Sequence, residues 1–105
     1  MTSVTFTSLL WVWQGEGAGR WHFLTVPEAQ SAEIKAHAFG MPRGFGSVRV
    51  EARFLPSTIS GQAVVWRTSV FPLSEGGYLL PVKADVRKRS AIVAGGEVTV
   101  TLELL

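Results

Sequence analysis

The order of elements in residues 78–105 constrains the fold more than any other feature of this chain. Tyr78–Pro81 is predicted to be a short strand that ends at a proline, because proline fixes φ and lacks a ladder donor. Val82–Ser90 then has the length of a helix of about two turns. A glycine pair supplies a turn, and Glu97–Leu104 alternates apolar and polar residues, as a half-buried strand does. The segment is therefore predicted to run strand, helix, strand.

The first half of the chain follows the same plan, preceded by one more strand. We expect, in order, a strand over Val4–Trp13, a glycine-rich hairpin loop over Gln14–Arg20, a strand over Trp21–Val26, a helix over Glu28–Phe39 and a strictly alternating strand over Ser47–Leu55. Pro27 separates the second strand from the helix, and Gly40, Pro42 and Gly44 mark the end of the helix and the loop that follows.

The predicted helix over Glu28–Phe39 has an apolar face of modest size. Ala32, Ala36 and Phe39 recur at helical spacing, with Ile34 and Ala38 alongside. We therefore expect these residues to be buried, with the charged residues of the helix facing water.

The second half of the chain completes the same order. After a loop over Pro56–Gly61, Gln62–Phe71 is predicted to be a strand stopped by Pro72, and Ser74–Gly77 a turn. Both halves, roughly residues 3–55 and 61–105, thus run strand, strand, helix, strand. One such unit leaves sheet edges unpaired, whereas two units around a pseudo-twofold axis close a barrel.

We therefore expect a single domain over residues 1–105 that is mainly β. Its predicted fold is a small closed β-barrel of the double-split or cradle-loop type, with pseudo-twofold duplicated ββαβ units and two short helices. The alternative is a chance ordering of common elements.

Composition narrows the class of protein. The chain has 105 residues, 47% of them hydrophobic, 17% charged, with a net charge of +2 and no cysteine. An apolar excess of this kind favours self-association, so a structural homodimer without a ligand is one hypothesis. The lack of cysteine excludes disulfides, thiolate catalysis and cysteine-ligated metals. The longest apolar run near the N-terminus, Leu9–Trp13, is far shorter than a membrane span, and no signal peptide is expected, which favours a cytoplasmic location.

Four sequence motifs resemble a known family. They are W-x-T-S-x-F-P at Trp66–Pro72, Y-x-L-P-V-K-A-x-V-R-K at Tyr78–Lys88, R-W-x-F at Arg20–Phe23 and G-F-G-S-V-R-V at Gly44–Val50. Together they resemble the bacterial domain of unknown function family numbered 1905 (DUF1905), and the resemblance covers nearly the whole chain. It implies a small β-barrel and no particular activity.

The last third of the chain is also similar to the AbrB-type swapped-hairpin DNA-binding motif. Pro81, Val86–Lys88 and Gly96 match that motif, whereas Glu97 stands where it prefers aspartate. The resemblance implies DNA binding by an intertwined dimer, although this chain is predicted to carry both halves itself.

One group of residues has the composition of a ligand site. Trp66, Arg67, Ser69, Tyr78 and Lys83 combine aromatic and polar side chains, which small-ligand pockets use at the mouth of a barrel. The alternative is that the two aromatic residues belong to the core and that the arginine only reaches water. The leading hypothesis is a non-catalytic binding or accessory module whose partner is an unknown small molecule, a peptide or another protein.

A second hypothesis rests on three consecutive cations. Arg87, Lys88 and Arg89 on a short helix could hold phosphates, which predicts a weak nucleic-acid-binding protein. The alternative is a solvated helix face in which Asp85 pairs with Arg89 four residues away.

No cofactor, metal or catalytic set is expected. His22 and His37 are the only histidines and lack further ligands at metal-binding spacing, and the glycine loops do not have dinucleotide or phosphate-loop spacing. Asp85 is the only aspartate, so no Ser-His-Asp set can be proposed. We therefore expect a protein that is not an enzyme.

Overall fold

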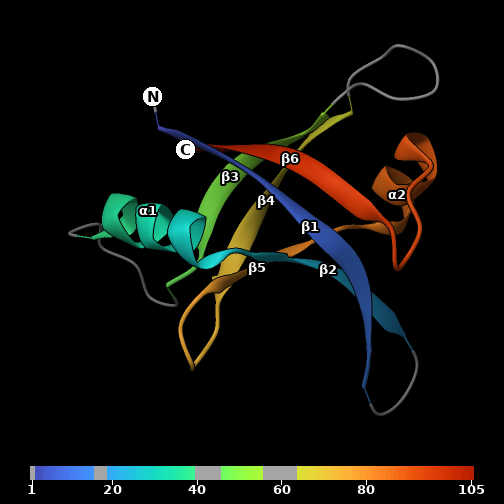
Figure 1. Cartoon of the computed structure of the whole chain (residues 1–105), viewed down its shortest axis with the longest axis horizontal. Coiled ribbons are helices and arrows are strands. Elements are labelled where there is room, and N and C mark those ends of the chain that lie inside the picture. Colours follow the sequence, from blue (N-terminus) through green and yellow to red (C-terminus); the bar gives the residue numbers. More distant parts are fainter. Residues whose placement is uncertain (1, 16–18, 40–45, 56–63) are drawn as a thin grey trace.

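The computed structural model of the chain is a closed barrel of six strands with two short helices (Figure 1). It describes residues 2–15, 19–39, 46–55 and 64–105. The elements are β1 (Ser3–Gln14), β2 (Arg20–Val26), α1 (Glu28–Ala38), β3 (Val48–Leu55), β4 (Val65–Pro72), β5 (Tyr78–Pro81), α2 (Ala84–Ser90) and β6 (Glu97–Leu104). None of the described helices has the length and apolarity needed to cross a bilayer.

The strands close in the order β1-β2-β5-β4-β3-β6, and every ladder is antiparallel. The mainly β barrel expected from the sequence is therefore confirmed. The predicted strands agree with the observed ones within a few residues. The predictions for Gly40, Pro42, Gly44, Pro56–Gly61 and the first two residues of Gln62–Phe71 lie outside the described residues, as do residues 16–18 of the predicted loop Gln14–Arg20, whose end residues belong to β1 and β2.

Alternation along the strands fills the barrel. In β3 and β6 alternate residues are buried, as their sequence pattern predicts. The fully buried aliphatic side chains that form the core are Leu10, Leu24, Ile34, Leu80, Leu102, Val48, Val50, Val70, Val86 and Val100. The outer face carries cross-strand polar pairs, among them the hydroxyl groups of Thr5 and Thr101, 2.8 Å apart.

The prediction of the buried face of α1 is largely wrong. Ile34 is fully buried and Ala38 half-buried, but Ala32 and Ala36 are exposed and Phe39 is 81% exposed. Because alanine gains little from burial, the single large aliphatic residue sets the orientation of the helix. Ser31 is buried on the same face of the helix as Ile34. Its hydroxyl donates to the carbonyl oxygen of Val26 at 3.1 Å, which offsets the cost of burying a polar group.

Helix α2 is shorter than predicted, because Val82 lies outside the helix and Lys83 is extended at its N-cap. The predicted ion pair is confirmed, with Arg89 Nε 3.5 Å from Asp85 Oδ2. Ala91 ends the helix in the left-handed conformation, at φ 56°, and its N–H donates to the carbonyl oxygens of Arg87 and Lys88. The buried face of α2 consists of Val86 and Ser90, which face the end of the barrel.

Candidate functional site

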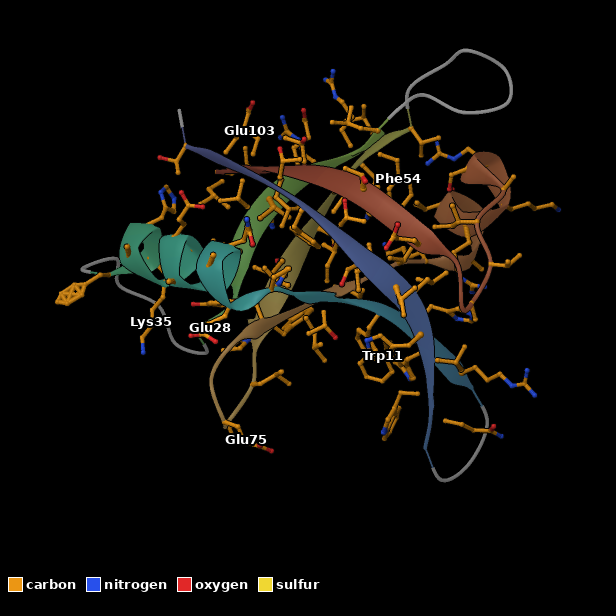
Figure 2. The ribbon with its side chains drawn as sticks, viewed as in Figure 1. Trp11, Glu28, Lys35, Phe54, Glu75 and Glu103 are labelled. Carbon is orange, nitrogen blue, oxygen red and sulfur yellow. The ribbon has the colours of Figure 1, made fainter. Side chains whose placement is uncertain are left out.

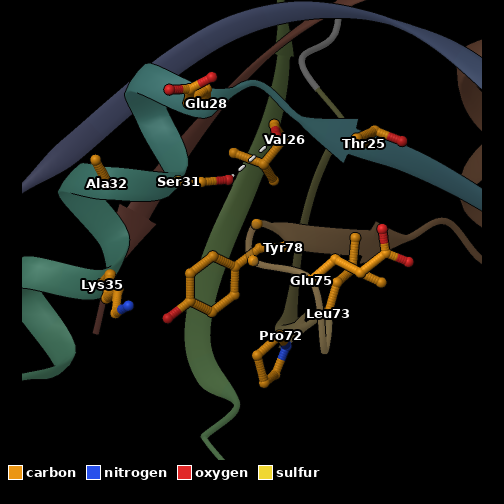
Figure 3. A pocket seen from close by; sticks show the side chains of 12 residues that line it. Thr25, Val26, Glu28, Ser31, Ala32, Lys35, Pro72, Leu73, Glu75 and Tyr78 are labelled. Atoms are coloured by element: carbon orange, nitrogen blue, oxygen red, sulfur yellow. Dashed lines mark hydrogen bonds between the residues drawn. The ribbon is translucent and has the colours of Figure 1, made fainter.

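Two grooves lie near opposite ends of the β2–β5 ladder. The first groove, about 510 Å³, lies between α1 and the β4–β5 turn (Figure 3). The second, about 580 Å³, lies between β2, β4, β5 and the start of α2. We call the second the aromatic-basic groove, after its lining residues Arg20, Trp21, His22, Phe23, Thr68, Phe71, Pro72, Leu73, Leu79, Pro81, Val82, Lys83, Ala84 and Arg87.

The aromatic wall of this groove is built on the β1–β2 hairpin. Trp11 lies directly opposite Phe23 and Trp13 opposite Trp21, so alternation brings all four rings to one outer face. The Phe23 ring is 5.3 Å from Trp11 and 6.3 Å from the parallel Trp21 ring. Trp11, beside the hairpin in Figure 2, also donates from Nε1 to Thr25 Oγ1 at 2.9 Å. These contacts hold Trp11, Phe23 and Trp21 against one another.

Much of this apolar wall is open to solvent. Trp21 is 56% exposed and Phe71 of β4 is 49% exposed. Leu79 and Pro81 of β5 complete the wall between them. Ordered aromatic side chains that remain exposed in a concave site are typical of binding surfaces.

The charged groups of the aromatic-basic groove all have the same sign. Arg20, Lys83 and Arg87 contribute cations, and no aspartate or glutamate occurs among the lining residues described above. Arg87 is held in place by its own side-chain contacts. Its Nε donates to the carbonyl oxygen of Val82 at 3.3 Å, and its Nη1 lies 3.3 Å from His22 Nε2.

The contact with Arg87 determines the tautomer of His22. A guanidinium can only donate, so Nε2 accepts and the ring hydrogen is assigned to Nδ1. Burial lowers the pKa of His22 below its usual 6.5, and the charges of Arg87 and Arg20 lower it further. The imidazole is therefore neutral at pH 7, and Nδ1 is buried without a hydrogen-bond partner among the described residues.

This arrangement predicts a loss of stability on mild acidification. Because the pKa of His22 is lower in the folded state than its unfolded value of 6.5, the unfolded chain binds more protons below that pH. The free energy of unfolding should then fall as the pH drops from 7 through 6.5 towards the folded value. His22→Gln should flatten this part of the profile when the pH dependence of urea unfolding is compared with that of the parent. An unchanged slope in His22→Gln would contradict the prediction.

The first groove has a different chemical character. Glu28, Lys35 and Glu75 contribute charges of both signs to it. Its lining includes Gly76 and Gly77 and lacks the cluster of exposed aromatic side chains found in the aromatic-basic groove. Figure 3 shows the Tyr78 ring reaching from β5 towards α1. Mixed charges beside a glycine turn favour no single ligand class.

The structure does not bring the five predicted site residues together. Trp66 is 8% exposed and packs in the barrel against Phe54, with ring centroids 4.8 Å apart. Arg67 faces outward, where its Nε lies 3.2 Å from Glu51 Oε2. The remaining three are separated too: Ser69 lies opposite Arg49 on β3, Tyr78 lines the first groove, and Lys83 lines the aromatic-basic groove.

The predicted basic cluster is also divided. Arg87 turns towards His22 and lines the aromatic-basic groove, whereas Arg89 pairs with Asp85. Lys88 is exposed beside them. The three cations therefore have different surroundings and do not form one uniform face.

Over residues 6–102 the sequence matches the family described as domain of unknown function (DUF1905). The chain belongs to the DUF1905 family. The resemblance carried by the four sequence motifs is thereby confirmed, whereas nothing supports the similarity to the AbrB-type motif. A comparison with curated proteins finds no match.

Sequence reasoning missed most of the aromatic wall of this DUF1905 domain. Trp21, Phe23, Phe71, Leu79 and Pro81 were not among the predicted site residues. One signal could have found the first two, because W-x-W and W-x-F flank a predicted hairpin loop and so place four rings on one face. Among the described residues, no group of three His, Asp or Glu side chains lies close enough to hold a metal ion.

Proposed function

We propose that this DUF1905 domain is a non-catalytic binding module whose ligand occupies the aromatic-basic groove. The ligand, a small molecule or a peptide, combines an apolar part with an anionic group. One observation carries the proposal: an ordered, exposed aromatic wall and three cations face the same groove, whose described lining includes no carboxylate. Apolar surface that is covered on binding contributes affinity, and unopposed cations select a ligand of negative charge.

Arg87 supports this proposal because its guanidinium is already oriented. Contacts to Val82 and His22 use Nε and Nη1, which leaves further N–H groups for an anion. A side chain held in place before binding loses less conformational entropy when the ligand arrives. Because His22 is neutral, it does not repel the positive charge of Arg87.

The proposal can be tested by NMR titration with 3-phenylpropionate and with capped hexapeptides that alternate aromatic and acidic residues. Amide and indole resonances of Trp21, Phe71, Leu79 and Lys83 should shift on binding, while resonances around Glu28 and Glu75 in the first groove stay unchanged. The matched uncharged amide, 3-phenylpropanamide, should bind more weakly. Uniform or absent shifts with every probe would contradict a site in this groove.

We also propose that the barrel is a pseudo-twofold duplication of a ββαβ unit, β1-β2-α1-β3 matched with β4-β5-α2-β6. Exchanging the two units leaves the set of strand pairings unchanged. The registers support the same match: the pair Val4–Leu102 corresponds to Trp66–Ala52, and Leu10–Leu24 corresponds to Pro72–Tyr78. This correspondence also superimposes Pro27 on Pro81, before the two helices.

The proposed duplication relates the two grooves to one another. In the match, Glu75 and Gly77 of the first groove correspond to Trp21 and Phe23 of the aromatic-basic groove. One copy of the site therefore has a carboxylate and a glycine where the other has aromatic rings. This difference supports a specialised role for the aromatic-basic groove, and it makes the first groove a suitable internal control.

A further inference from the structure

Strand β4 has an edge that is paired over only a small part of its length. The strand spans Val65–Pro72, but its ladder with β5 contains only the pairs Phe71–Leu79 and Pro72–Tyr78. From there the two strands diverge, as Figure 1 shows. Within the described residues, most of β4 pairs with a strand only on the β3 side.

The hydrogen-bond pattern shows which main-chain groups lie on the open edge. The N–H of Phe54 donates to the carbonyl oxygen of Val64, so these two residues face each other across the β3–β4 ladder. Directions alternate along an antiparallel strand, so Trp66 and Thr68 also direct their main-chain groups to β3. The N–H and C=O groups of Arg67 and Ser69 therefore point to the open side, in line with those of Phe71, which pair with Leu79.

The open edge adjoins the aromatic-basic groove. Thr68 and Phe71 of β4 line that groove together with Lys83 and Arg87. A chain segment lying along the edge would thus run beside the aromatic wall and past the cations. The main-chain groups of Arg67 and Ser69 flank Thr68, which lines the groove, so the edge and the groove adjoin along the chain.

Among the described residues, the matching edge of β1 is protected in a way that the β4 edge is not. There α1, with eleven residues, packs against β1. The hydroxyl of Ser8 also bridges β1 and β2 by donating to the carbonyl oxygen of Thr25 at 2.7 Å. Helix α2 has only seven residues and does not pack against β4 to the same extent. Exposed strand edges are usually blocked, so an open one beside a groove indicates a place for an added strand.

We propose that the open edge of β4 and the aromatic-basic groove together bind an extended peptide segment of another protein, which adds to the barrel as a strand. The segment carries aromatic side chains for the wall formed by Trp21 and Phe71, and a carboxylate for Lys83 and Arg87. Main-chain bonds to Arg67 and Ser69 supply affinity, and the alternating side chains supply specificity. This inference rests on the proposed function, because it assigns the occupant of the same groove.

Along a bound strand, every second N–H group would face β4. The test therefore uses synthetic peptides in which one alternating set of N–H groups is removed by N-methylation. A set of capped hexapeptides that alternate aromatic and acidic residues is titrated by calorimetry, and the tightest binder is remade in two N-methylated forms. One form is methylated at the odd positions and the other at the even positions. Since only one register can donate to β4, one form should lose at least about tenfold in affinity and the other much less. 3-Phenylpropionate, which has no peptide group, is the reference ligand.

Variants at Ser69 give an independent readout. Ser69→Pro removes an N–H that faces the open side and leaves the ladder with β3 intact, as proline is tolerated at a strand edge. Ser69→Pro should lower the affinity for the peptide at least about tenfold and leave the affinity for 3-phenylpropionate unchanged. The control variant Ser69→Ala keeps the N–H group and should bind both ligands as the parent does.

The outcomes separate the two proposals. Loss in one methylation register, with protection of the Arg67 and Ser69 amides from exchange, would support strand addition. Equal binding of both methylated forms, or a peptide that binds no more tightly than 3-phenylpropionate, would overturn strand addition and leave the groove as a small-ligand site. If neither the peptides nor 3-phenylpropionate bind, both the inference and the proposed function fail.

Discussion

Leu24→Ala should lower the free energy of unfolding by about 2–5 kcal/mol, because it leaves a cavity where the two halves of the barrel meet. Leu24 is fully buried and lies directly opposite Leu80, which is also fully buried, in the β2–β5 ladder. Leu24 also lies opposite the buried Leu10 in the β1–β2 ladder, so strands on both sides limit how far the cavity can collapse. Urea unfolding followed by circular dichroism measures the effect.

The control for this prediction is Leu9→Ala, which makes the same chemical change on the outer surface. Leu9 is 56% exposed, so its loss should change the free energy of unfolding by less than about 1 kcal/mol. A double variant of Leu24 and Leu80 tests the contact itself, since neighbouring residues are not additive. Equal effects of Leu24→Ala and Leu9→Ala would contradict the burial of this pair.

Arg87→Gln should weaken the binding of an anionic groove ligand by about 10- to 100-fold, the usual range for one charge-assisted hydrogen bond. Glutamine keeps an N–H for the carbonyl oxygen of Val82 but removes the charge. The substitution also removes one of the two cations that lower the pKa of His22, so that pKa should rise towards its ordinary value. Calorimetry measures the affinity, and NMR titration of the imidazole measures the pKa.

The matched control for Arg87 is Lys35→Gln, which removes a cation from the first groove. It should leave both the affinity and the His22 titration unchanged. Arg87→Lys separates charge from geometry, because lysine keeps the charge but lacks the planar fork of donors. An Arg87→Gln protein that binds an anionic ligand as tightly as the parent would exclude Arg87 from the site.

Strand positions could be predicted from the sequence because burial on one face imposes alternation. Val48–Leu55 and Glu97–Leu104 alternate strictly, and the prolines and glycines between strands mark where each ladder must stop. Because both halves have the same order of strands and helix, the sequence also predicted that they pair into a closed barrel. The orientation of α1 could not be predicted in the same way, since its alanines carry little hydrophobic signal and one residue, Ile34, determines the outcome.

The site was harder to predict because it depends on the direction of side chains at the ends of ladders. Trp66 and Arg67 are neighbours in sequence but face opposite sides of β4, one into the core and one to solvent. Lys83 lines a groove, but the aromatic residues near it come from β2 and β4, far away in the chain. Charge alone could not separate Arg87 from Arg89, which differ in burial and in the partner that each side chain contacts.

The pairing of the strands also determines how this chain must fold. β1 lies beside β6, β2 beside β5, and β3 beside both β4 and β6, so all three strands of the first half depend on partners from the second. Val4 pairs with Leu102 across almost the entire sequence. Contacts between such distant residues form late, because the entropy cost of closing a long loop precedes the favourable energy of the contacts. Folding should accordingly be slow for a domain of this size and strongly cooperative. Neither half of the chain should be stable without the strands of the other half.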